Sequence, residues 1–384
     1  MASIIFCIII VLLYLLINRK RLNIFLYYMI GFYLLVMIGS CLCITTGVYP
    51  WYVDLINILL FTLVFLFCVN PFKRISLDIG NLINIDEKML NRFAIVYVVG
   101  FLIYLIVFVP KFIESINSGS YLILYQDMRN GNIDKFANTG EKWLYYFVSR
   151  LQYPAMLVGF VFLCKEKIKK GLGMIIAPFT AVSIYAVYIV SRTEIFQIVL
   201  LVILLFILFY KQLPKKINYS LITVLSVLII IIMGFNADIT SSRTEYKTDN
   251  LWILNYFGRS VLTFNSILEY PCTAKDGIYF FGTQHYFNIS HPSYGGHEFV
   301  PTFARMYMDF GYLGFLIFIL IPKVLPTKIK SIPKFYVVLW IYNTLLLGVM
   351  YSNFTISEII FACIIYALLK VLFMNPKRKM SQYN

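Results

Sequence analysis

The sequence predicts an all-α integral membrane protein with about eleven transmembrane helices, and three observations support this fold class. Hydrophobic residues make up 60% of the 384 residues, only 13% are charged, and the mean hydropathy is +0.80. Soluble domains have about 25% charged residues. Apolar runs of about 20 residues, the length that crosses the hydrocarbon core of a bilayer, recur along nearly the whole chain. We therefore expect a single polytopic membrane domain over residues 1–384.

The first apolar run resembles a signal peptide in position only. Its basic cluster, Arg19-Lys20-Arg21, follows the run instead of preceding it, and no small-residue cleavage site is evident. We expect a retained helix with its N-terminus outside. The predicted spans, in chain order, are 3–17, 24–43, 52–69, 93–109, 144–164, 172–190, 194–210, 218–236, 304–321, 333–350 and 355–373.

The distribution of charge supports this list of spans independently. With the N-terminus outside, alternate connections between the spans are expected in the cytoplasm. These connections, counted together with the adjoining span ends, carry 22 of the 33 Lys and Arg but only four of the 18 Asp and Glu. Basic residues concentrate in cytoplasmic loops of membrane proteins. The net charge of +15 is thus an orientation signal. It does not indicate a nucleic-acid partner, and the C-terminus is expected in the cytoplasm.

Two segments expected outside are long. Residues 110–143 form the smaller external loop, and residues 237–303 form the larger one, which is rich in aromatic residues. Within the larger loop, the stretch 251–270 is apolar but is interrupted by Asn255, Gly258, Arg259 and Asn265. A helix of this kind is expected to lie in the interface instead of crossing the bilayer. A crossing there would also exchange the inside and outside charges downstream and break the charge rule.

Charged residues that border the spans lie near their outer ends, and arginine is enriched there. Six of the eleven external basic residues are Arg, against five of the 22 internal ones. The planar guanidinium suits bidentate recognition of phosphate. The alternative is pairing with nearby acids, since Arg305 and Asp309 are spaced four residues apart and Arg192 is near Glu194. The candidate phosphate-binding residues are Arg150, Arg192, Arg243, Arg259 and Arg305.

The three histidines fall within 13 residues of the larger external loop, at positions 285, 291 and 297. Their spacing matches no ordinary zinc pattern, so no metal site is expected. A neutral imidazole can accept a proton from a sugar hydroxyl, although surface histidines need have no such role. The candidate proton acceptors at the outer face are His291, His297, Glu245 and Asp309.

Three short motifs resemble those of a known family. They are Gly295-Gly296 with Pro301-Thr302, the stretch from Tyr307 to Gly314 (Tyr-Met-Asp-Phe-Gly-Tyr-Leu-Gly), and Ser191-Arg192-Thr193 on a short outer turn. These motifs, together with the expected helices and the dominant external loop, are similar to those of the Wzy-type polymerases of bacterial O-antigen and capsule repeat units. The motifs cover about 20 residues, whereas the resemblance in architecture covers the whole chain.

The resemblance implies glycosyl transfer at the outer face of the bacterial cytoplasmic membrane. The growing glycan would leave its undecaprenyl-diphosphate carrier and join a single lipid-linked repeat unit. The implied partners are undecaprenyl-diphosphate-linked oligosaccharides and the lipid bilayer, with a chain-length regulator and a flippase as further candidates; neither a metal nor another cofactor is implied. The external arginines would stabilise the charge of the lipid diphosphate, and one of the candidate bases would activate the acceptor hydroxyl.

Three other functions remain open on the sequence, one of them a structural or sensory role, for which Lys should replace the external arginines without loss. An O-antigen ligase would use similar chemistry with a lipid A acceptor. A lipid-linked oligosaccharide flippase, a transporter, is expected to have two related halves and charged groups near the bilayer midplane, and neither feature is evident in the sequence.

Overall fold

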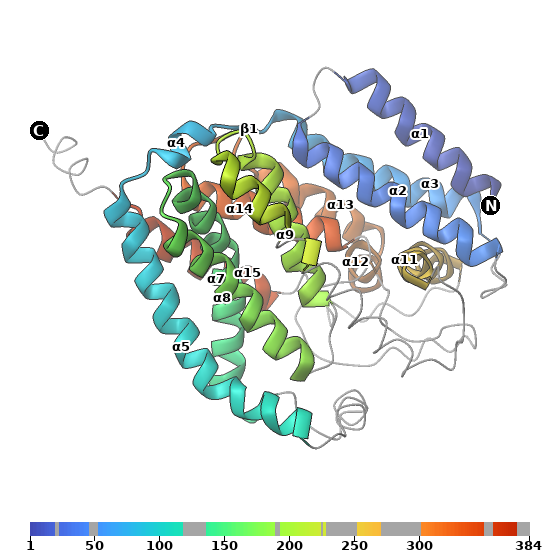
Figure 1. Ribbon diagram of the computed structural model, residues 1–384. Helices are drawn as coiled ribbons and strands as arrows, with labels where there is room; N and C mark the ends of the chain where they lie inside the picture. Colours follow the sequence, from blue (N-terminus) through green and yellow to red (C-terminus); the bar gives the residue numbers. More distant parts are fainter. Residues whose placement is uncertain are drawn as a thin grey trace, which may run out of the picture. The chain divides into compact units, whose positions relative to one another are not determined.

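The computed structural model of the 384-residue chain is mostly helical (Figure 1). The structure describes residues 1–19, 23–45, 53–117, 136–188, 193–223, 226–227, 252–269, 301–348 and 356–374. Within these residues, four helices are long and apolar enough to cross a membrane, in the segments Ile24–Thr45, Leu55–Arg74, Glu87–Glu114 and Thr139–Cys164. Shorter apolar helices accompany them. The chain therefore has the features of an all-α membrane protein, whereas the count of eleven spans and their orientation stay predictions.

Two compact units divide the chain, and each is described by itself. Unit 1 comprises Met1–Ser76, Tyr246–Ile329 and Val338–Ile360; unit 2 comprises Leu77–Glu245, Lys330–Val337 and Phe361–Asn384. Both α14 (Ile332–Gly348) and α15 (Ile356–Leu372) contribute residues to both units.

The helices of unit 1 begin with α1, α2 and α3, which pack against one another because their contacting faces are apolar. Tyr33 of α2 stacks on Phe65 of α3 with ring centroids 4.5 Å apart, and its hydroxyl lies 2.7 Å from that of Thr62. The elements of this unit, with their bounds, are α1 (Ala2–Asn18), α2 (Ile24–Thr45), α3 (Leu55–Val69), η2 (Asn70–Arg74), α11 (Trp252–Glu269), α12 (Thr302–Phe310), α13 (Tyr312–Leu320) and η4 (Ile321–Val324).

At one end of unit 1, asparagine side chains link the end of α1 and the start of α2 to η2 by hydrogen bonds. Asn23 caps α2 by accepting a hydrogen bond from the Leu26 amide at 3.0 Å, and it donates to the Phe72 carbonyl of η2. Lys73 donates to Asn18 at the end of α1 at 2.8 Å. These bonds satisfy polar groups at helix ends, where the backbone lacks intrahelical partners. Strands β1 (Ser76–Leu77) and β2 (Lys328–Ile329) pair close by as a two-stranded sheet.

Unit 2 is built on α5, α7, α8 and α9. Its core includes Tyr104 of α5, whose hydroxyl donates to the Ala181 carbonyl of α8 at 2.9 Å. Helices α7 and α8 approach closely because Gly159 and Gly171 face each other; a Cβ on Gly159 would lie 3.0 Å from the Gly171 carbonyl oxygen. The elements are α4 (Ile79–Ile83), α5 (Glu87–Asn117), α7 (Thr139–Cys164), α8 (Ile168–Tyr188), α9 (Thr193–Phe209) and a helical segment over 215–223.

Helices occupy most of the predicted spans, but the prediction of one continuous helix over 304–321 was wrong. The chain breaks at Gly311, whose φ of 59° and ψ of −147° are incompatible with a helix. Helix α12 ends there, and α13 starts again and packs back on α12. A Cβ on Gly314 would lie 2.0 Å from the Met306 carbonyl oxygen, so the two helices touch through backbone. For the span 218–236, only the first part lies in the described residues.

Candidate functional site

The helix expected at the membrane interface is α11, and it lies across the end of α2. Figure 1 shows α11 close to end-on, whereas α2 runs across the view. Of all the elements that α11 contacts, α2 has the most extensive contact with it. The crossing is close because two glycines meet: a Cβ on Gly258 would fall 2.2 Å from the Gly39 carbonyl carbon. Ser40 strengthens the contact, since its hydroxyl oxygen lies 2.9 Å from the Gly258 carbonyl oxygen.

A second polar contact holds α11 against the start of α3. Asn265 is fully buried, and its side-chain oxygen accepts hydrogen bonds from the Asp54 amide at 3.0 Å and from the Asn57 side chain at 3.2 Å. Asp54 in turn caps α3 by accepting from the Ile56 amide at 3.0 Å. From the sequence, Asn265 was only an interruption of an apolar stretch. Its partners are about 210 residues away in the chain, so no local pattern could have identified them.

An aromatic cluster joins α11 to α12. Phe264 of α11 and Phe303 of α12 have ring centroids 5.1 Å apart, and both contact Phe61 of α3 edge-on. Phe315 of α13 completes the cluster at 6.0 Å from Phe264. All four side chains are buried. Because the cluster is made by three segments that are distant in the chain, it fixes α11 and α12 on the same part of α3.

Three of the predicted site residues lie on these two helices of unit 1. Arg259 follows Gly258 on α11, is half-buried, and lies close enough to the Cys43 thiol of α2 to interact with it electrostatically. Arg305 and Asp309 lie on α12, four residues apart as predicted. Asp309 is buried, with 5% of its surface exposed, and Arg305 is half-buried. The structure thus brings an acidic and two basic side chains into one unit.

Arg150 lies in unit 2 and deeper in its helix than expected. Helix α7 begins at Thr139, before the predicted start at 144, and Arg150 is its twelfth residue. At a rise of about 1.5 Å per residue, the arginine is roughly 16 Å from the first residue of the helix. It is only 9% exposed, and the neighbouring Gln152 is also buried. A buried arginine in a helix that is long and apolar enough to cross a membrane is therefore a candidate functional position.

Pro154 lies one turn after this arginine. A proline has no amide hydrogen, so Pro154 cannot donate the usual helical hydrogen bond to the carbonyl four residues earlier, that of Arg150. Helix α7 therefore has a buried charge and an altered backbone hydrogen-bonding pattern at one level.

The other predicted site residues, namely His291, His297, Glu245, Arg192 and Arg243, lie outside the described residues. Glu358, an acid near the start of the predicted span 355–373, is buried in the first turn of α15. Comparison of the chain with protein-family models, curated protein sequences and solved structures found no match. The helical fold and the long apolar helices of the described residues indicate an all-α membrane protein, and any narrower function is a proposal.

Proposed function

We propose that the protein is a membrane glycosyltransferase that polymerises undecaprenyl-diphosphate-linked oligosaccharide repeat units at the outer face of the bacterial cytoplasmic membrane. The observation that carries the proposal is the arrangement of α11 and α12. Neither is among the described helices that could cross a membrane alone, since α11 is interrupted by polar residues and α12 has only nine residues. Each carries a candidate substrate-binding residue, and the Phe264–Phe303 contact joins them. Both helices belong to or adjoin the larger external loop, whose residues 270–301 link them in the chain, so a lipid-linked substrate at the interface would meet both.

The chemistry assigned to each residue follows from its type. Arg259 and Arg305 bind the lipid diphosphate, which is the leaving group, and neutralise the charge that develops on it as the glycosidic bond breaks. Asp309 lies one turn from Arg305 and is a candidate proton acceptor for the attacking sugar hydroxyl. His291, His297 and Glu245 are alternatives for that acceptor, and Arg192, Arg243 and Arg150 are further candidates for phosphate binding.

Deletion of the gene in a host that carries its glycan cluster tests the proposal. The surface polysaccharide is separated on a gel, with complementation by the wild type. Loss of the ladder with retention of a single repeat unit supports the polymerase. Long chains that remain on the lipid carrier would instead identify a ligase, and loss of all repeat units from the outer face would favour a flippase. An unchanged ladder would contradict all three functions.

A further inference from the structure

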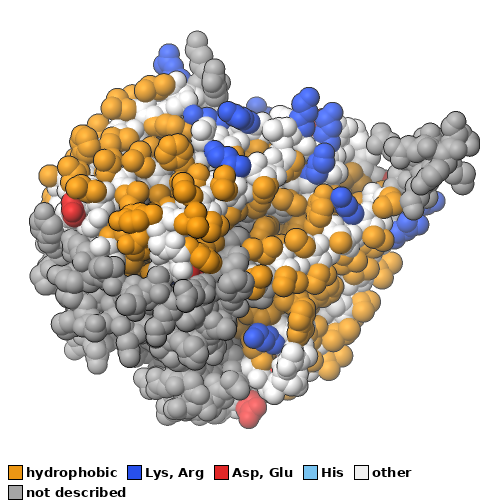
Figure 2. Space-filling model, turned by 180° about the vertical axis from the view of Figure 1, so that it is seen from behind, with side chains coloured by type: hydrophobic (Ala, Val, Ile, Leu, Met, Phe, Trp, Pro, Cys, Tyr) orange, Lys and Arg blue, Asp and Glu red, His pale blue; other side chains and the backbone are white. Residues whose placement is uncertain are grey.

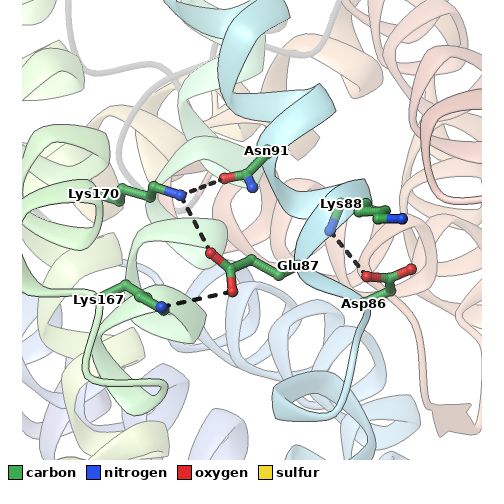
Figure 3. A network of polar contacts seen from close by, with 6 residues as sticks. All are labelled: Asp86, Glu87, Lys88, Asn91, Lys167 and Lys170. Atoms are coloured by element: carbon green, nitrogen blue, oxygen red, sulfur yellow. Dashed lines mark hydrogen bonds and ion pairs between the residues drawn. The ribbon is translucent and has the colours of Figure 1, made fainter.

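One end of unit 2 carries a concentration of lysines that the proposed function does not use. Helix α5 begins at this end, and the turn between α7 and α8 lies against it. Figure 3 shows Lys167 of this turn and Lys170 in the first turn of α8 pointing toward the same carboxylate, Glu87 in the first turn of α5. The Nζ atoms lie 3.9 Å and 3.2 Å from the two carboxylate oxygens of Glu87, respectively. Lys170 also donates to Asn91 at 3.0 Å.

The acids at this end do not balance the bases. Asp86 uses a carboxylate oxygen to accept the Lys88 amide at 3.0 Å, and Glu87 is shared by two lysines. The third acid, Glu166, is exposed in the turn after α7. The bases around these acids are exposed or half-exposed and give a surplus of positive charge: Lys88 and Arg92 on α5, with Lys165, Lys167, Lys169 and Lys170 beyond α7. This set is called the lysine rim below.

The lysine rim borders an apolar surface. Ile168, in the same turn, is 48% exposed, and Ile95, one turn beyond Arg92 on α5, is 65% exposed. The exposed apolar side chains continue along α5 through Val99 and Leu102. Figure 2 shows that, on the face it draws, Lys and Arg side chains lie next to extended areas of exposed hydrophobic side chains. A phospholipid has this sequence of charge and hydrocarbon along its length.

We propose that the lysine rim binds the phosphate headgroup of an anionic phospholipid, with the acyl chains lying on the exposed apolar side chains of α5. Basic residues at the boundary of a membrane domain attract anionic headgroups, and each one close to the surface strengthens binding several-fold. Lys167 and Lys170 are the central residues, because Glu87 and Asn91 hold both ammonium groups at one place. Besides holding the two ammonium groups in place, Glu87 carries a negative charge that repels the phosphate of the lipid headgroup.

Native mass spectrometry of the detergent-purified protein tests the proposal. Cardiolipin and phosphatidylglycerol are titrated as anionic probes, with phosphatidylethanolamine as the zwitterionic control. We expect Lys167→Gln with Lys170→Gln to weaken binding of the anionic lipids about tenfold or more. The matched control is Lys215→Gln with Lys216→Gln, which removes two exposed lysines from the start of the helical segment over 215–223 and should change the affinity less than twofold.

Glu87→Gln gives a second test with the opposite sign. Removing the carboxylate leaves both lysines in place, so the anionic lipids should bind more tightly. Equal weakening by the two double-lysine variants would show diffuse attraction and overturn the proposal, as would binding of phosphatidylethanolamine as tight as that of cardiolipin. Displacement of the lipids by millimolar inorganic phosphate would identify a site for free phosphate instead. If the Lys167/Lys170 variant does not fold, weaker lipid binding by Glu87→Gln would still contradict the proposal.

Discussion

Gly258 of α11 and Gly39 of α2 are in backbone contact, so that a Cβ on Gly258 would lie 2.2 Å from the Gly39 carbonyl carbon. No side chain fits at this crossing. The contact determines how near α11 comes to α2, and Arg259 is the next residue in the chain. The position of one candidate phosphate-binding side chain therefore depends on the absence of a side chain at its neighbour.

The first prediction concerns this crossing. Gly258→Ala should lower the free energy of unfolding by about 1–3 kcal/mol, because a methyl group forced into packed backbone makes the helices move apart. The thermal unfolding midpoint of the purified protein in detergent measures the change. Gly31→Ala, on the partner helix α2, is the matched control. Nothing lies within 4 Å of its Cβ position and alanine favours a helix, so this variant should not lower the midpoint. Equal midpoints for the two variants would show that α11 does not cross α2 at Gly258.

The second prediction tests the break between α12 and α13. At φ 59° and ψ −147°, Gly311 has a backbone conformation that residues other than glycine rarely adopt. Gly311→Ala should therefore destabilise the protein by about 1–3 kcal/mol, and Gly311→Asn should do no better. A continuous helix over 304–321 requires the opposite sign, because alanine would then stabilise it by about 1 kcal/mol. The direction of the shift in unfolding midpoint separates the two structures.

The third prediction concerns the turn after α7. Glu166 has a φ of 59°, a left-handed conformation in which glycine is favoured at the end of a helix. Glu166→Gly should raise the free energy of unfolding by about 1 kcal/mol, because a Cβ costs about that much there. Glu166→Ala keeps the Cβ and serves as the comparison. If glycine and alanine shift the unfolding midpoint equally, the left-handed conformation is not present.

The fourth prediction separates a guanidinium clamp from simple positive charge. Arg259→Lys and Arg305→Lys keep the charge but lose the planar fork that binds two phosphate oxygens. Each should lower the rate of polymerisation about tenfold or more at normal protein levels, in keeping with loss of one stabilising donor in a transition state. Arg74→Lys, at an exposed position of η2, should leave the rate unchanged. Wild-type rates for both Arg259→Lys and Arg305→Lys would remove these arginines from the proposed site.

The helices were predictable from the sequence because a long apolar run has few alternatives to a helix. The polar interruptions Gly258, Arg259 and Asn265 also separated α11 from the spans. The break at Gly311 could not be predicted from hydropathy. The run from Tyr312 onward is as apolar as a span, and hydropathy carries no information on whether the φ of a residue is positive. Gly314 packs closely against α12, the helix just before it in the chain.

The site could be predicted only as residue types. Arg305 and Asp309 are local in the chain, so their shared helix follows from their spacing. The contact that brings Arg259 to the same unit passes through Phe264 and Phe303, which are 39 residues apart in sequence. Such pairings depend on side-chain packing between distant segments, and no periodicity encodes them. The burial of Arg150 was missed for a simpler reason: α7 starts five residues earlier than its apolar stretch.

The central proposal is that this chain joins lipid-linked repeat units. The most direct measurement is made on the purified protein in liposomes, incubated with the undecaprenyl-diphosphate repeat unit of its host and no nucleotide sugar. The account predicts a ladder of lipid-linked products that grows with time and persists in the presence of a metal chelator. If the folded protein leaves the repeat unit unextended, the claim is contradicted.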